Sequence, residues 1–169
     1  MLRLNEPQKV GYNFILNKWK ESGLTDQRWL AYMLATAWHE TAHTLEPVRE
    51  YGGEAYLRSK KYWPYVGQGY VQLTWRANYE KYGIADTPER ALDPEFAAHI
   101  MIDGMTKGIF TGRKLSDYFN AKKDDPVNAR RIINGMDRAD LIAGYYREFL
   151  SGLKFTLPET DDVSGPALA

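Results

Sequence analysis

The pattern of apolar and polar residues predicts a chain made mostly of α-helices. An apolar stripe near its start has the spacing of one helix face and consists of Val10, Phe14, Ile15 and Trp19. Gly23 follows this stripe and is expected to end the helix, because glycine readily adopts the left-handed conformation found at helix C-termini.

A second apolar stripe predicts another helix, which Thr25 or Asp26 caps and Pro47 limits. The stripe consists of Leu30, Met33, Leu34, Ala37 and Thr41. After it, residues 48–69 are polar and rich in Gly and Tyr, which predicts a long loop or a small hairpin.

The remaining helices are predicted from the signals at their ends. Thr74 is expected to cap a short helix that ends at Gly83. Asp-Pro pairs at 93–94 and 125–126 each predict a helix start, because proline fits the first helical position. A last helix is predicted over residues 137–150.

These elements predict a mainly α fold with a single domain. We expect residues 1–155 to form that domain, with the long loop or hairpin lying over one side. Residues 156–169 are rich in Pro, Asp, Gly and Ser and are expected to be a flexible tail.

The amino-acid composition limits the classes of protein to which the chain can belong. The chain has 169 residues, of which 44% are hydrophobic, enough for the core of one domain. The 22 Lys and Arg residues balance 22 Asp and Glu residues, which argues against binding to nucleic acid. Cysteine is absent, which excludes a disulfide framework, a thiolate zinc site and a cysteine nucleophile. Aromatic residues make up 14%, more than a core alone needs, and such rings often line surfaces that bind ring-shaped ligands.

The sequence also predicts where the protein resides. Residues 1–6 contain a basic residue but no apolar run follows it, so we expect no signal peptide. The longest apolar run, residues 29–38, is about half of the roughly 20 residues that a membrane span requires. We therefore expect a protein that is made in the cytosol, does not insert into a membrane, and needs a separate pore-forming protein for release.

One motif suggests a metal. His39-Glu40-Thr41-Ala42-His43 matches the helical HExxH motif of zinc metallopeptidases. A catalytic zinc needs a third protein ligand, and Glu46 and Arg49 occupy the positions where the extended motif has Gly and His. We therefore expect no metal or other cofactor, with a zinc metallopeptidase kept as an alternative. His43 is more simply a histidine that interacts with the carbonyl groups at a helix C-terminus.

Glu40 is the better candidate for catalysis. It lies at the end of the second apolar stripe, where loss of hydration favours the protonated form that a general acid needs. The alternative is a solvated glutamate paired with a nearby Arg or Lys. A glycosidase requires a second carboxylate, roughly 6.5–9.5 Å away in inverting enzymes, and Glu46, Glu50 and Glu54 follow closely in the chain.

Several segments together resemble the family-19 glycoside hydrolases, and among these the short phage endolysins and their prophage relatives. The segments are ATAWHETA at 35–42, PVRE at 47–50, YVGQGYVQLTW at 65–75, Asn78-Tyr79 and IING at 132–135. The resemblance covers residues 29–148. It implies a lysozyme-like helical fold with two lobes and a cleft, and inverting hydrolysis of β-1,4-linked N-acetylated amino sugars without a cofactor.

The resemblance also implies roles for individual residues. Glu40 occupies the general-acid position, and Glu50 fits the general base, with Glu54 as the alternative base. Thr74 matches the hydroxyl residue that holds the attacking water. The candidates for binding substrate are His39, Tyr65, Gln68, Tyr70, Gln72, Asn78 and Asn134.

Each of these positions has an alternative, purely structural role. Thr74 is a candidate N-cap, Gln72 could satisfy loop backbone, and the tyrosines could pack the loop. Asn78 and Asn134 could be buried structural amides. The sequence also departs from the family at Gln68, where the usual residue is Arg, and at Met136, where the usual residue is Gly.

The expected substrate is bacterial peptidoglycan. The short chain, the absent signal peptide and the absent cysteines favour an endolysin over a secreted chitinase of the same family. We expect a monomer that waits in the cytoplasm of a host bacterium and then cleaves the glycan strands of the cell wall. Chitinase activity and a catalytically inactive glycan-binding module are the alternatives.

Overall fold

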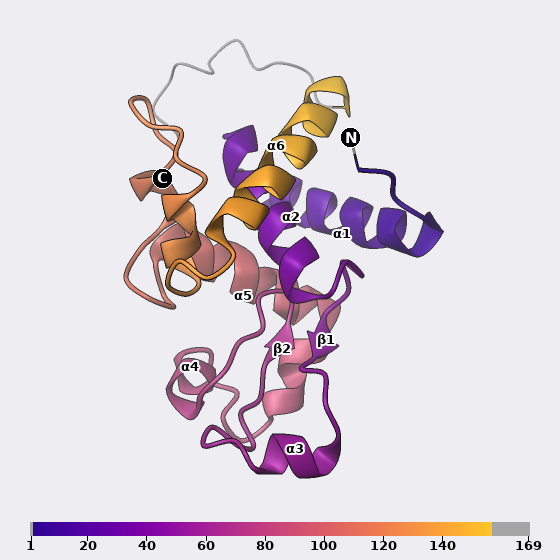
Figure 1. The fold of residues 1–169 in the computed structure, drawn as a ribbon, viewed down its shortest axis with the longest axis vertical. Helices are drawn as coiled ribbons and strands as arrows, with labels where there is room; N and C mark the ends of the chain where they lie inside the picture. Colours follow the sequence, from indigo (N-terminus) through magenta and orange to yellow (C-terminus); the bar gives the residue numbers. More distant parts are fainter. Residues whose placement is uncertain (1, 157–169) are drawn as a thin grey trace.

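The protein is mainly helical, as the sequence predicts. The computed structural model describes residues 2–156, so most of the predicted tail, residues 157–169, lies outside the described residues. The α-helices are α1 (Glu6–Ser22), α2 (Gln27–Glu40), α3 (Glu54–Arg58), α4 (Arg76–Lys81), α5 (Pro94–Lys107) and α6 (Ala139–Thr156). Two short strands, β1 (Val48–Arg49) and β2 (Gln68–Gly69), and three 3₁₀ turns, η1 (Pro88–Leu92), η2 (Leu115–Asp117) and η3 (Asn128–Ile132), complete the chain (Figure 1).

Helix α2 forms the centre of the core. Every residue from Trp29 to Trp38 is buried, so the predicted stripe is correct but covers only part of a helix that is enclosed on all sides. Asp26 caps it by accepting a hydrogen bond from the Arg28 N–H at 2.9 Å, and α6 crosses it and packs against it (Figure 1). The helix ends at Glu40, well before Pro47.

Helix α1 ends where the sequence predicts and buries Ile15 and Trp19 of the predicted stripe, but its buried face is shifted away from Val10. Gly23 adopts a φ of +78° and closes the helix. Val10 is 70% exposed, which contradicts its placement in the apolar stripe, whereas Gly11 is buried. A Cβ atom on Gly11 would lie 2.3 Å from the carbonyl oxygen of Leu45, so glycine allows the turn after α2 to contact α1 closely.

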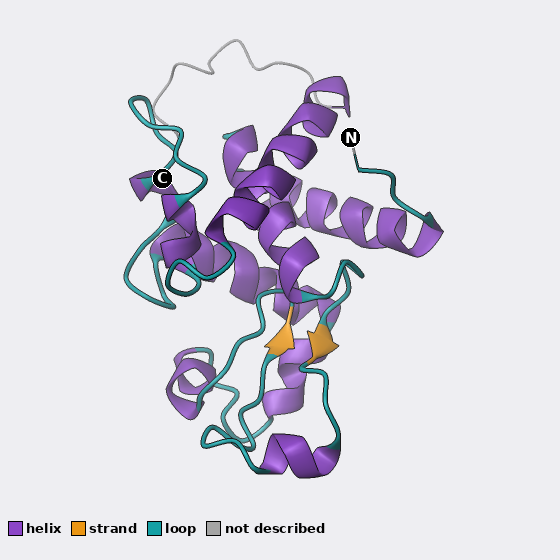
Figure 2. Cartoon of the chain, in the orientation of Figure 1, coloured by secondary structure: helices purple, strands orange, loops and turns teal. Residues whose placement is uncertain are grey.

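The predicted long loop is closed by a small hairpin. Strands β1 and β2 pair antiparallel, with Val48 opposite Gly69 and Arg49 opposite Gln68 (Figure 2). Between them lies α3, a single helical segment that the sequence pattern did not reveal because it is too short to show a period.

Of the later helices, some begin where the sequence predicts a helix start and others do not. Asp93 caps α5, which confirms the helix start predicted from the Asp-Pro pair, and Gly108 ends the helix at a φ of +73°. The second Asp-Pro pair precedes only the 3₁₀ turn η3. Helix α6 begins at Ala139, after Arg138 at a φ of +61°, and continues past Leu150. Within residues 2–156, none of the helices combines the length and apolar character needed to span a membrane.

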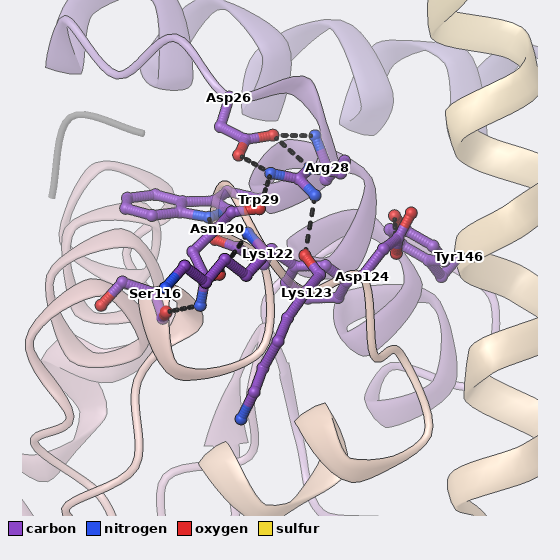
Figure 3. A network of polar contacts seen from close by, with 10 residues as sticks. Asp26, Arg28, Trp29, Ser116, Asn120, Lys122, Lys123, Asp124 and Tyr146 are labelled. Atoms are coloured by element: carbon purple, nitrogen blue, oxygen red, sulfur yellow. Dashed lines mark hydrogen bonds and ion pairs between the residues drawn. The ribbon is translucent and has the colours of Figure 1, made fainter. Parts of the chain in front are cut away.

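A polar network fixes the start of α2 to the loop before η3 (Figure 3). The Arg28 guanidinium pairs with Asp26 at 2.8 Å and donates to the carbonyl oxygens of Asn120 at 3.1 Å and Lys123 at 2.9 Å. The Tyr146 hydroxyl of α6 donates to Asp124 at 2.9 Å. These contacts hold α2, the loop and α6 together. They thereby fix the position of the helix that ends at Glu40.

Candidate active site

Glu40 is the last residue of α2, and its side chain is 15% exposed. Its Oε1 atom accepts a hydrogen bond from Nη2 of Arg130 at 3.2 Å, and Nε2 of His39 lies 3.9 Å from the same oxygen. Helix α2 runs toward the two strands, which the chain reaches through residues 41–47 (Figure 1). The carboxyl group is therefore nearly buried at the end of a rigid helix.

Arg130 is a buried cation that sequence reasoning missed. It lies in η3, its side chain is 3% exposed, and its Nε donates to the carbonyl oxygen of Asp137 at 2.9 Å. Its Nη1 is buried and finds no hydrogen-bond acceptor among residues 2–156. No local spacing could reveal this role, because the partner carboxylate comes 90 residues earlier in the chain.

The position of Glu40 at the end of an apolar stripe predicts apolar surroundings, but a guanidinium and an imidazole lie beside its carboxyl group. Burial lowers the pKa of His39, and the adjacent Glu40 only partly offsets this. His39 is therefore a neutral imidazole at neutral pH, and Arg130 is the cation that acts on Glu40.

Glu50 follows β1 directly and is held by groups of its own loop. Its Oε2 accepts a hydrogen bond from the Tyr62 hydroxyl at 2.7 Å, and its Oε1 accepts one from the Gly67 N–H at 3.0 Å. Its own N–H donates to the Gly67 carbonyl at 2.6 Å. Burial and the contact with Glu50 raise the pKa of Tyr62 to about 12, so this hydroxyl is protonated and can donate at neutral pH.

Glu54, the alternative base, has a different environment. It lies at the start of α3 and its side chain is 56% exposed. Its Oε1 is 3.2 Å from Nε of Arg58, and its Oε2 is 3.6 Å from Nη1 of Arg49. Each carboxylate oxygen of Glu54 is therefore paired with a guanidinium group, as in an ordinary surface ion pair. This favours Glu50 over Glu54 as the carboxylate that the fold holds in one position.

Thr74 does not cap α4, which corrects the prediction. Helix α4 begins at Arg76, its N-cap position is Trp75, and Thr74 instead donates its hydroxyl hydrogen to the Gln72 carbonyl at 2.8 Å. The Asn78 amide in turn donates to the Thr74 carbonyl at 2.9 Å. The unusual backbone at Trp75, with a φ of +76°, separates Thr74 from the helix.

The side-chain amide of Gln72 forms hydrogen bonds with the protein backbone. Its Nε2 donates to the carbonyl oxygens of Val48 at 2.8 Å and Gly69 at 3.1 Å. These bonds connect both strands of the hairpin to the segment that carries Thr74. The structural alternative for Gln72 is therefore observed, and it leaves only Oε1 to contact a ligand.

Two of the substrate-binding candidates belong to the core. Gln68 is 5% exposed, and its amide donates to the Tyr79 hydroxyl at 2.9 Å and the Pro88 carbonyl at 3.1 Å. Tyr70 is 2% exposed, which leaves no ring face for a sugar, so its placement in a binding surface is wrong for this conformation. Gln68 instead connects β2 to Tyr79 and to η1, and Tyr70 packs in the hydrophobic core.

Two further candidates retain accessible surface. Tyr65 is half-buried, packs against Tyr79 with ring centroids 5.3 Å apart, and donates to the Ala85 carbonyl at 3.0 Å. Asn134 is exposed, and its Oδ1 accepts the Gly135 N–H at 2.8 Å. Asn134 is thus a turn residue on the surface and not a buried structural amide.

The zinc motif does not form its required geometry. Because α2 ends at Glu40, His43 is not on the helix, and it adopts a φ of +72°. Its ring stacks on Trp38 at 4.5 Å, and its Nε2 lies 3.3 Å from the Tyr145 hydroxyl. His39 and His43 therefore do not share one helix face, as two zinc ligands at this spacing must. Nor does the described part of the chain contain a cluster of three or more His, Cys, Asp or Glu side chains that could hold a metal ion.

Comparisons with known proteins give no match. No protein-family model, no curated protein and no solved structure matches the chain. Its function must therefore be inferred from its motif residues and from the geometry around Glu40 and Glu50.

Proposed function

We propose that the protein is an inverting glycoside hydrolase in which Glu40 is the general acid and Glu50 the general base. The observation that supports this most is the contrast between the two carboxyl groups. Glu40 is nearly buried beside a cation, whereas Glu50 is half-buried and fixed by a phenol and a backbone N–H. Two carboxyl groups in different environments are the usual basis of paired acid and base roles.

In the proposed reaction, Glu40 donates its proton to the glycosidic oxygen as the bond from that oxygen to the anomeric carbon breaks. A water molecule attacks the anomeric carbon from the opposite face and gives its proton to Glu50. The configuration at the anomeric carbon is inverted in one step. The reaction consumes one water, and neither a metal nor a cofactor takes part.

Arg130 supports the charge that this reaction creates. Glu40 becomes a carboxylate as it delivers its proton, and the guanidinium 3.2 Å away stabilises the developing charge. Because Arg130 is buried and anchored to the Asp137 carbonyl, it does not need to move during the step.

Thr74 is proposed to orient the attacking water together with Glu50. Its hydroxyl hydrogen is already donated to the Gln72 carbonyl, so its oxygen can only accept a hydrogen bond from a water. Glu50 also acts as an acceptor. The two oxygens would therefore take the two hydrogens of one water and turn its lone pair toward the sugar.

We propose bacterial peptidoglycan as the substrate and a lysozyme-like arrangement of two lobes, with Glu40 and Glu50 on either side of the glycan strand. The protein would act as a monomeric endolysin that accumulates in the cytoplasm of a host bacterium. A separate pore-forming protein would then give it access to the wall. Neither nucleic acid nor a membrane is expected as a partner.

Incubation with purified cell wall and with colloidal chitin tests this proposal. New reducing ends from cell wall, with few from chitin, would support an endolysin, and the reverse result would indicate a chitinase. Binding to the wall without any product over a wide range of pH would contradict the catalytic role and indicate a glycan-binding module.

A further inference from the structure

One tryptophan differs from the others in its exposure. Trp19, Trp29 and Trp38 are buried in the core and Trp63 is half-buried, whereas Trp75 is 52% exposed. A large indole in water is costly because its apolar surface remains hydrated. The fold therefore holds this ring outside the core, immediately before α4.

The backbone at Trp75 is strained. Its φ of +76° and ψ of 139° border a region that is almost confined to glycine. The Trp75 N–H donates to the Tyr65 carbonyl at 3.0 Å, which helps to hold this conformation. Residues kept in such conformations cluster at functional sites, because the surrounding structure must stabilise them against their own preference.

The exposed ring is connected to the proposed base through one side chain. Tyr62 packs against Trp75 edge to face, with ring centroids 5.4 Å apart and an interplanar angle of 74°. The hydroxyl of the same tyrosine donates to Oε2 of Glu50 at 2.7 Å. The indole, the phenol and the carboxylate therefore form one continuous chain of contacts, in which the indole is the outer member.

We propose that Trp75 is a substrate-binding residue that stacks its indole against an N-acetylated pyranose ring next to the position cleaved by Glu40 and Glu50. This inference rests on the proposed function. A pyranose presents a face of C–H groups that packs well on a flat aromatic ring, and an amphipathic ring fixed by a neighbour loses little entropy on binding.

The backbone conformation of Trp75 allows a test variant that removes the indole without straining the fold. Trp75→Gly removes the indole and introduces the residue that the φ of +76° favours, so the fold is preserved or stabilised. Trp75→Phe retains an aromatic face and the contact with Tyr62. Leu141→Ala serves as a control, because it removes a 45% exposed apolar side chain from α6 without touching this region.

Binding is measured by titration calorimetry in a Glu40→Gln background, which prevents turnover. The probe is soluble, peptide-free glycan strands prepared from purified cell wall. We expect Trp75→Gly to weaken binding about tenfold or more, and Trp75→Phe and Leu141→Ala to change it less than about threefold. Unfolding in urea should show that Trp75→Gly is at least as stable as its parent.

Several results would overturn the inference. If Trp75→Gly binds the strands as tightly as its parent, the ring is not a binding surface. If binding is unchanged but Trp75→Gly in the otherwise native protein lowers kcat with KM constant, the ring only positions Tyr62. If the native protein releases no sugar and the Glu40→Gln protein binds no strand, the proposed function fails and this inference fails with it. Cleavage with an unaffected Trp75→Gly variant rejects the inference alone.

Discussion

Nη2 of Arg130 lies 3.2 Å from Oε1 of Glu40, although the two residues are 90 positions apart in the chain. The side chain of Arg130 is 3% exposed and that of Glu40 is 15% exposed, so solvent screens this pair little. The pair joins the end of α2 to η3, and it places a fixed positive charge beside the proposed general acid.

Replacing Arg130 should affect both stability and activity. Arg130→Met leaves a nearly buried carboxyl group without its cation, and we expect a loss of about 3 kcal/mol in the free energy of unfolding. Arg130→Lys keeps the charge, but one ammonium group cannot reach both Glu40 and the Asp137 carbonyl as the guanidinium does, so the loss should be smaller. Urea unfolding and the rate of wall hydrolysis measure the two effects. Arg131→Met is the matched control, since Arg131 is exposed.

The two candidate bases can be separated by isosteric substitutions. Glu50→Gln removes the carboxylate that Tyr62 and Gly67 hold, and we expect activity to fall by at least about a hundredfold. Glu54→Gln weakens only exposed ion pairs with Arg49 and Arg58, and activity should change less than about twofold. The release of reducing ends from purified wall gives both numbers. The opposite ranking of the two variants would assign the base to Glu54.

The pKa of His39 predicts how stability depends on pH. Burial lowers this pKa below 6.5, so the unfolded chain takes up a proton at a higher pH than the folded protein does. The contribution of His39 to stability is therefore complete above pH 6.5 and is lost as the pH falls from there through the folded-state pKa. Urea unfolding at pH 7.5 and pH 5 should show a smaller loss for His39→Gln than for the native protein. His99→Gln is the control, and an equal loss in native protein and His39→Gln would contradict this account.

Removal of metal ions should not change the activity. His43 turns away from the end of α2 and stacks on Trp38, so no pair of imidazoles faces Glu40. We expect wall hydrolysis to be the same after dialysis against EDTA as before it. A loss that added zinc restores would instead support the metallopeptidase alternative.

Helix ends were predictable from the sequence where a single residue determines them. Gly23 ends α1 in the left-handed conformation, and Asp26 and Asp93 act as caps. The prediction failed at Thr74, because the capping rule assumes that the helix follows directly, whereas the strained backbone of Trp75 intervenes. It failed at Val10 because the buried face of α1 is shifted by one residue toward Gly11.

The site was predictable only as far as its motif residues. The carboxyl groups of Glu40 and Glu50 could be named from the sequence, but their partners could not. Tyr62 reaches Glu50 through the folding of the loop around α3, and Arg130 reaches Glu40 across the core. Gln68 and Tyr70 belong to the same motif block, yet both are buried. The sequence could not predict this, because alternate positions of so short a hairpin do not reveal which side is buried.

The configuration of the newly formed reducing end tests the pairing of Glu40 with Glu50 most directly. Proton NMR recorded in the first minutes of cell-wall digestion distinguishes the two anomers before they equilibrate. We predict that the native protein releases the α-anomer from a β-linked strand, and that Glu40→Gln releases no product although it remains folded. Release of the β-anomer, or near-native hydrolysis by Glu40→Gln, would contradict the proposed mechanism.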